Sequence, residues 1–226
     1  MKKVIITLIL LAVSIATGNA QLFVEGGVSG VYMGETSSLD GITKELPSYF
    51  DLNLSFSAGY RLNEKTSLGV SATRFKRAYS TEIIDLNTGD REPTEVNQHG
   101  WSFAVFDRYK IWGPKKISFM LESSFYFNKN TFEGHGGLAQ FWNTTHSLIG
   151  VKALPLISYN LSDRFSIIAS TDFLSMNLSY LVINYKDTGM KTSSWGFGFD
   201  AQSTIFDRLS SIRIGIIYHF KNQANE

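Results

Sequence analysis

The stretch SIRIGIIYHF, residues Ser211 to Phe220, alternates between apolar and small or polar side chains. The apolar row consists of Ile212, Ile214, Ile216, Tyr218 and Phe220, and only Ile217 interrupts the alternation. A period of two is typical of a β-strand with one apolar and one polar face. Because the row ends in two aromatic residues, it favours a strand whose outer face meets lipid and whose end lies at the membrane interface. A strand of a soluble β-sandwich would show the same alternation, so the rest of the chain must distinguish the two.

Residues 1–20 predict a secretory signal peptide. Lys2 and Lys3 give a charged start, residues 4–16 are almost wholly apolar, and Ala20 ends a run of small residues before Gln21. These are the three parts of a cleavable export signal. The chain has no cysteine, so no lipid-acceptor residue follows the cut and no disulfide framework is possible. We therefore expect an exported protein.

The composition of the rest of the chain argues against two classes of protein, nucleic-acid-binding proteins and helical membrane proteins. Removing 20 of the 226 residues leaves 206, enough for one domain. Without Lys2 and Lys3, 19 of the 21 basic residues remain against 20 acidic residues, a balance that argues against a nucleic-acid partner. No later apolar run is long enough for a transmembrane helix, yet 17 Phe, 10 Tyr and 4 Trp form a heavy aromatic load. Membrane β-barrels have this profile, because their membrane signal is confined to alternation within short strands.

The connections between the predicted strands alternate between long and short. We expect strands at 22–33, 50–62, 66–79, 101–112, 117–128, 144–161, 164–180 and 209–220. Short turns follow at Asn63-Glu64, Gly113-Pro114-Lys115 and Ser162-Asp163, whereas long polar loops are expected at 34–48, 80–97 and 129–143. Short periplasmic turns and long extracellular loops are typical of outer-membrane barrels.

The sequence therefore predicts an all-β fold, an antiparallel up-and-down transmembrane β-barrel of eight strands. Closure into a barrel leaves no sheet edge in lipid, where its backbone groups could not form hydrogen bonds. Residues 195–205 also alternate like a strand, and we interpret them as part of a loop or as an extension above the membrane. A turn at 174–177 would instead give ten strands, which is the alternative. The expected parts are a signal peptide at 1–20, the barrel at 21–220 and a short polar tail at 221–226.

Three segments resemble a known group of proteins. They are the Ala20-Gln21 junction, the segment SYNLSDRFS from Ser158 to Ser166, and the ending from Leu209 to Phe220. They are similar to small outer-membrane β-barrel proteins of Bacteroidota-type bacteria, a group similar to the OmpX/OmpA barrel class. The resemblance implies a location in the bacterial outer membrane and insertion by the barrel-assembly machinery, which would recognise Tyr218 and Phe220 in the terminal strand. Residues 221–226 depart from the group, whose members usually stop at the terminal Phe.

The two faces of the predicted strands divide the remaining side chains. The lipid-facing side would carry Leu52, Leu54, Phe56, Phe119, Leu121, Ile212, Ile214 and Ile216, and the lumen would carry Asp51, Arg108, Glu122, Lys152, Asp172 and Arg213. Charges removed from water need partners, and the six lumen charges comprise three of each sign. Arg108 and Glu122 lie at similar heights on neighbouring strands, and so do Asp172 and Arg213. We expect a paired network that fills the lumen, with a charge-lined pore as the alternative.

No pattern in the sequence predicts a catalytic residue, a cofactor or a metal site. His146 and Ser147 are adjacent, but neighbours on a strand point to opposite faces and cannot form a nucleophile and its base. No metal-ligand spacing is present. An enzyme that modifies lipid at the barrel rim is the least favoured interpretation.

The long loops would hold any specificity of the protein. Leu138, Phe141 and Trp142 could form a contact patch for an extracellular partner, or belong to the outer aromatic girdle. The expected function is thus a monomeric, non-enzymatic outer-membrane barrel with a structural or surface-interaction role. Its partners would be outer-membrane lipid, the barrel-assembly machinery and a possible extracellular molecule. A small porin-like channel is the alternative function.

Overall fold

The computed structural model describes residues 21–33, 36–39, 42–45, 49–84, 91–135, 143–171, 175–200 and 212–220. The main sheet contains β1 (Gln21–Met33), β4 (Tyr49–Arg61), β5 (Thr66–Ile84), β6 (Arg91–Trp112), β7 (Ile117–His135), β8 (Thr144–Asn160), β9 (Phe165–Thr171), β10 (Ser175–Tyr185), β11 (Lys191–Asp200) and β12 (Ile212–His219). A separate hairpin is formed by β2 (Thr36–Leu39) and β3 (Ile42–Glu45). Among the described residues, no helix is long and apolar enough to cross a membrane.

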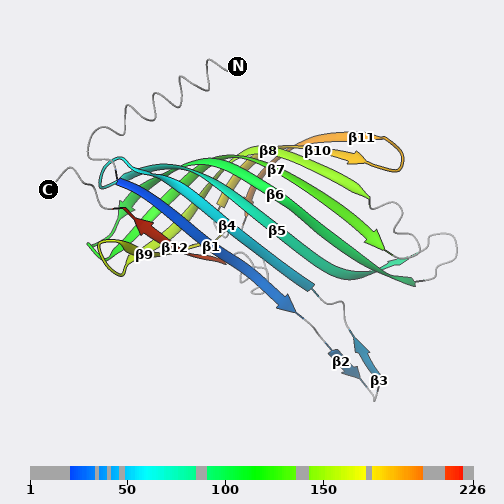
Figure 1. Cartoon of the computed structure of the whole chain (residues 1–226). Coiled ribbons are helices and arrows are strands. Elements are labelled where there is room, and N and C mark those ends of the chain that lie inside the picture. The colour runs from blue at the N-terminus through cyan, green and yellow to red at the C-terminus, as the bar shows by residue number, and fades with distance from the viewer. Residues whose placement is uncertain are drawn as a thin grey trace.

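The sheet closes into an antiparallel barrel of eight strands (Figure 1). The circuit runs β8, β7, β6, β5, β4, β1, β12 and β9, and it closes because β9 pairs with β8 through Leu156↔Ser170 to Asn160↔Ser166. β10 continues along β8 where β9 ends, from Met176↔Ala153 onward, and β11 pairs with β10. The two extra strands therefore extend the wall along β8 without adding to the circuit, which confirms eight strands and not ten.

Three short turns lie together at one end of the barrel, which we call the turn end. In the first, the side chain of Asn63 accepts hydrogen bonds from the backbone amides of Lys65 and Thr66, both at 2.8 Å. Ser162 accepts backbone amides in the same way in the third turn. The second turn contains Gly113 with a φ of 138°, a left-handed conformation that glycine adopts without steric cost. The opposite end is the loop end.

The strands are longer at the loop end than the alternation predicts. β5 and β6 stay paired as far as Ile84↔Arg91, and β7 continues to His135, so much of the expected loops at 80–97 and 129–143 is strand. The β2–β3 hairpin likewise lies in a stretch expected to be irregular. Apolar alternation predicts only the part of a strand whose outer face is apolar. The backbone hydrogen bonds between strands continue beyond that part, between residues with polar side chains. The sequence pattern therefore underestimates these strands.

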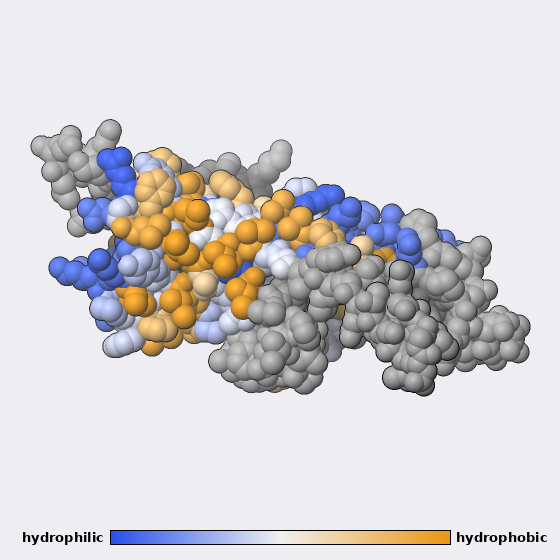
Figure 2. Space-filling model, turned by 90° about the horizontal axis from the view of Figure 1, so that it is seen from below, coloured by the Kyte–Doolittle hydropathy of each residue, from blue (hydrophilic) through white to orange (hydrophobic). Residues whose placement is uncertain are grey.

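The outer wall of the barrel carries an apolar belt (Figure 2), with hydrophilic residues on both sides of it. Exposed large apolar side chains occur on β4, β6, β7, β8 and β12, for example Phe56, Val105, Phe125, Val151 and Ile216. Seven of the eight residues expected to face lipid are among the exposed ones, and Leu52 is half-buried. Soluble monomers rarely expose so large a contiguous apolar surface.

The interior contains an apolar layer that the alternation does not predict. Buried inward-facing side chains from five strands pack together there: Phe23, Phe106, Leu154, Leu156, Ile168 and Ile217, with Met120 against them. Ile217, the residue that interrupts the alternation of the last strand, belongs to this layer. The rest of the lumen is polar, and the charged groups described next lie against this layer.

Candidate functional site in the barrel lumen

Arg108 lies at the centre of the lumen between two carboxylates. Its Nε donates to Glu122 at 2.7 Å and its Nη1 donates to Glu25 at 2.6 Å. Arg108 and Glu122 are register partners on β6 and β7, whereas Glu25 reaches across the lumen from β1. The Arg108 side chain is 3% exposed and that of Glu25 is 1% exposed. Short, charge-assisted bonds of this kind are the strong ones in protein interiors.

Aromatic rings hold the same guanidinium from a third side. The Arg108 guanidinium carbon lies 4.5 Å from the centroid of the Phe106 ring and 5.9 Å from that of Phe23. Both rings belong to the apolar layer, so the ion pairs and the layer form one continuous cross-section. A cation is attracted to the face of an aromatic ring, and the attraction strengthens as water is removed.

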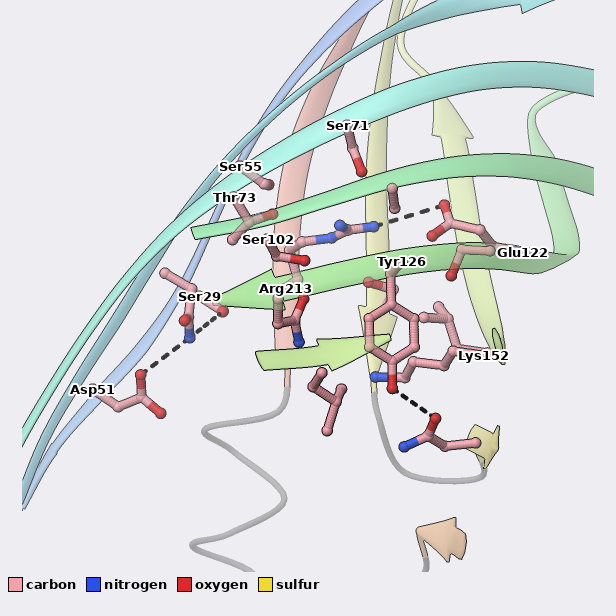
Figure 3. A pocket seen from close by; sticks show the side chains of 18 of the residues that line it. Ser29, Asp51, Ser55, Ser71, Thr73, Ser102, Glu122, Tyr126, Lys152 and Arg213 are labelled. Carbon is pink, nitrogen blue, oxygen red and sulfur yellow. Dashed lines mark hydrogen bonds and ion pairs between the residues drawn. The ribbon is translucent and has the colours of Figure 1, made fainter. Parts of the chain in front are cut away.

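Arg213 of β12 adds a second cation to this group. Its Nη2 lies 4.0 Å from Glu25 and 3.9 Å from Glu122, and its side chain is 22% exposed. Figure 3 shows Arg213 and Glu122 directed toward each other at the wall of the lumen. Two arginines and two glutamates thus make a charge-balanced cluster, which we call the lumen cluster. Removing one member would leave opposite charge buried without its partner.

A second ion pair lies nearer the loop end. Asp51 and Arg77 are register partners on β4 and β5, and Arg77 Nη2 donates to Asp51 at 2.7 Å. Asn53 also donates to Asp51, at 3.1 Å. Asp51 is buried, whereas the Arg77 side chain is 42% exposed. This pair is partly solvated, so losing one of its partners costs less than losing a member of the lumen cluster.

Two cavities lie on opposite sides of the lumen cluster. The loop-side cavity has a volume of about 490 Å³ and includes Asp51, Glu122, Tyr126, Lys152 and Arg213 in its wall. The turn-side cavity has a volume of about 800 Å³ and includes Phe23, Arg108 and Ile217. Figure 3 shows the loop-side cavity to be lined largely by serine, threonine and other polar side chains. The cluster and the apolar layer separate the two volumes.

The six residues predicted to face the lumen lie in different surroundings, and one of them is not described by the structure. Arg108, Glu122 and Arg213 meet in the lumen cluster, Asp51 lies in the second ion pair, and Lys152 lines the loop-side cavity. Asp172 lies outside the described residues, and so do Leu138, Phe141 and Trp142 of the expected loop patch. The expected pairing of Asp172 with Arg213 therefore stays a prediction; among the described residues, Arg213 lies beside both Glu122 and Glu25.

Sequence reasoning missed Glu25 and Arg77. Glu25 lies in a glycine-rich strand, where Gly26, Gly27 and Gly30 blur the alternation that would have assigned its face. Its face does follow from the pairing of β1 with β12, in which Glu25 lies opposite the inward-facing Ile217. Arg77 lies at the loop end of the expected strand, where the apolar row has already ended.

Ser166 and His219 form a contact that could be mistaken for a catalytic pair. His219 Nε2 lies 3.2 Å from Ser166 Oγ, and both residues are buried. Ser166 Oγ donates its proton to Asn160 at 2.8 Å, so His219 donates to Ser166 and does not accept from it. A serine whose proton is directed away from the histidine is not an activated nucleophile. The contact joins β9 and β12 at the turn end.

The surroundings of His146 and of the acidic side chains do not form a catalytic or metal-binding arrangement among the described residues. His146 lies 3.1 Å from Thr144 Oγ1 and its ring packs on Phe132, with centroids 4.2 Å apart. Within the part of the chain that the structure describes, no group of three or more His, Asp or Glu side chains is arranged to hold a metal ion.

No protein-family model matches the chain, and the comparison with curated proteins gives no match. Several solved structures have a similar backbone fold. Neisserial surface protein A (NspA) is 15% identical, with 89% of this chain and 99% of that chain covered and a TM-score of 0.43. The outer membrane protein OprG from Pseudomonas aeruginosa is 14% identical, with 90% and 97% covered and a TM-score of 0.47. The attachment invasion locus protein Ail of Yersinia pestis, in complex with the heparin analogue sucrose octasulfate, is 12% identical, with 89% and 98% covered and a TM-score of 0.36.

Proposed function

We propose that this protein is an integral β-barrel of the bacterial outer membrane with a blocked lumen and a non-enzymatic, structural or surface-interaction role. The apolar belt on the outer wall supports the membrane location, because such a surface is stable in lipid and not in water. The closed circuit of strands supports it further, since a closed barrel leaves no unpaired edge in lipid.

The observation that carries the proposed role is the burial of Arg108 between Glu25 and Glu122. A guanidinium that is 3% exposed and bonded to two carboxylates is part of a packed cross-section and not of a solvated path. The apolar layer lies against the same group and leaves separate cavities on its two sides. An eight-stranded barrel is narrow enough for side chains to fill it. The alternative, a small channel, requires these side chains to move apart.

The proposed partners follow from the apolar belt and from the two ends of the barrel. The belt would contact outer-membrane lipid, and Tyr218 and Phe220 on the last strand would be recognised by the barrel-assembly machinery. Their rings pack edge to face with centroids 4.9 Å apart, which presents them as one aromatic unit. The long loops at the opposite end would meet any extracellular partner, and we expect the barrel to act as a monomer.

Cell fractionation tests this proposal directly. The protein expressed in its host should stay with the outer-membrane fraction after a carbonate wash. On gels in dodecyl sulfate, the unheated protein should migrate differently from the boiled protein, because a closed barrel resists the detergent until it is heated. Recovery in the wash, with one mobility whether boiled or not, would contradict the membrane barrel.

A further inference from the structure

Three cations lie close together on the outer wall of the barrel: Arg74 and Lys76 of β5 and Lys129 of β7. All three side chains are exposed. Arg74 is the register partner of Trp101 on β6, and Trp101 is the partner of Lys129. Register partners share one face of a sheet with their Cβ atoms about 5 Å apart. We call Arg74, Lys76 and Lys129 the basic patch.

The basic patch lies where the apolar belt ends at the loop side. On β5 the outward row is Leu68, Val70 and Ala72 before it reaches Arg74, and on β7 it is Phe125 and Phe127 before it reaches Lys129. On β6 the belt ends in Trp101, which is 45% exposed. Tryptophan at the limit of an apolar belt is typical of the membrane interface, where lipid headgroups lie.

No acidic side chain neutralises the patch within its own rows. The row through Arg74 contains Leu54, Trp101, Lys129 and Ser147, and the row through Lys76 contains Leu52, His99, Thr131 and Thr145. On β7 the next outward acid, Glu133, lies beyond both rows. The Arg74 guanidinium is held over the Trp101 ring, 4.9 Å from the centroid, which fixes it against the wall.

We propose that the basic patch binds the phosphate group of an anionic membrane lipid whose acyl chains lie along the belt beneath it. This inference rests on the proposed function, because it needs the belt to be in a bilayer. The arginine fork can bind two phosphate oxygens, while the lysines supply point charges on either side. Each basic residue near an anionic lipid surface strengthens binding about 5-fold, so three cations correspond to about 100-fold.

The test uses Trp101 as a reporter of the lipid beside it. The mature chain, with Trp112, Trp142 and Trp195 replaced by Phe, is refolded into phosphatidylcholine vesicles. These contain a fixed fraction of dibrominated phosphatidylglycerol or dibrominated phosphatidylcholine. Bromine quenches tryptophan fluorescence at contact, so the ratio of the two quenching efficiencies measures the preference for the anionic lipid. Both leaflets have one composition, so the orientation of the barrel does not matter.

The decisive comparison is between two triple variants. Arg74→Gln, Lys76→Gln and Lys129→Gln together remove the basic patch. Lys65→Gln, Lys115→Gln and Lys116→Gln remove three exposed cations at the turn end and serve as the matched control. We expect a clear preference of Trp101 for phosphatidylglycerol in the parent and control, and the loss of this preference in the patch variant. Equal quenching by both lipids in the parent, or an unchanged preference in the patch variant, would overturn the lipid site.

Two further outcomes separate the possible causes of failure. If inorganic phosphate at the same concentration as the phosphatidylglycerol abolished the preference and sodium chloride of equal ionic strength did not, the patch would bind free phosphate in place of the lipid, and the assignment to lipid would be wrong. If neither brominated lipid quenched Trp101, the barrel would not be in the bilayer, and the proposed function itself would fail.

Discussion

Arg108 is the residue whose surroundings distinguish a blocked lumen from a pore. It balances Glu25 and Glu122 at distances of 2.6 and 2.7 Å, and it packs on Phe106 within the apolar layer. A buried ion pair of this kind adds little net stability compared with apolar residues of the same size, but losing one partner is costly. The cluster is therefore sensitive to single substitutions and tolerant of joint ones.

We predict that Arg108→Leu lowers the free energy of unfolding by about 3–5 kcal/mol, because it leaves two buried carboxylates, Glu25 and Glu122, with only the more distant Arg213 to balance them. Urea unfolding of the barrel in vesicles measures the change. The variant that combines Arg108→Leu with Glu25→Gln keeps one cation, Arg213, beside one carboxylate, Glu122, so it should recover most of the loss. A single variant as stable as the parent would show that the three side chains do not form the buried cluster.

Gly59 provides a second test at the scale of the residue. A Cβ atom at this position would lie 2.2 Å from the Leu68 carbonyl oxygen and 2.8 Å from the Phe23 ring. We therefore expect Gly59→Ala to destabilise the folded barrel by about 1–3 kcal/mol in the same urea measurement. The control is Gly26→Ala, because a Cβ at that outward position meets no atom within 4 Å. If both substitutions had equal effects, the close approach of β4, β5 and Phe23 would be wrong.

At the scale of the element, strands divide into the part that alternation predicts and the part that it does not. The row from Phe50 to Leu62 predicts β4 almost to the residue, because each outward position there needs an apolar side chain. The ends of β5, β6 and β7 could not be predicted from apolar alternation, since beyond the belt only backbone pairing holds them.

The candidate site could also be predicted only in part, namely where its residues lie on adjacent strands. The equal heights of Arg108 and Glu122 on adjacent strands follow from counting residues from the turn, and the structure pairs them. Glu25 comes from a distant part of the sequence, 83 residues from Arg108, and only closure of the barrel brings it near. Ile217 interrupts the alternation because an apolar residue is needed inside at that level.

The outward row of β8 allows a test of the belt. Val151 is 48% exposed and lies between Phe125 of β7 and Leu178 of β10. A lysine deep in lipid costs about 2–4 kcal/mol, so we expect Val151→Lys to lower the stability of the barrel in vesicles by that amount. Glu64→Lys at the exposed first turn is the control and should change stability by less than about 0.5 kcal/mol. A Val151→Lys barrel as stable as the parent would place this face outside the membrane.

The last strand carries a prediction about assembly. The Tyr218 ring packs with the rings of Phe165 and Phe220 on the wall, so replacing Tyr218 and Phe220 by Ala removes an aromatic unit from the turn end. We expect this variant to accumulate more slowly in the outer membrane of cells, measured by the heat-resistant band in a pulse experiment. Refolding into vesicles, which needs no assembly machinery, should change much less. An equal defect in both would indicate a purely structural role for the two rings.

At the scale of the whole molecule, one cross-section, made of the lumen cluster and the apolar layer, separates two cavities inside a barrel whose outer wall is apolar. In the proposed function the belt lies in a bilayer, the long strands carry polar surface beyond the loop-side edge of the belt, and the lumen cluster with the apolar layer would block passage. These features fit a membrane anchor whose activity lies at its surface, and they predict that the barrel conducts no ions.

The measurement that tests this claim most directly is single-channel conductance of the refolded mature chain in a planar bilayer. The parent and Glu122→Gln should both be silent, in samples whose heat-dependent mobility shows that the barrel is folded. The double variant Phe106→Ala, Arg108→Ala, which removes the centre of the cross-section, should conduct and so prove that the barrel is inserted. Discrete conductance steps in the parent, altered by Glu122→Gln, would contradict the blocked lumen and establish a charge-lined channel.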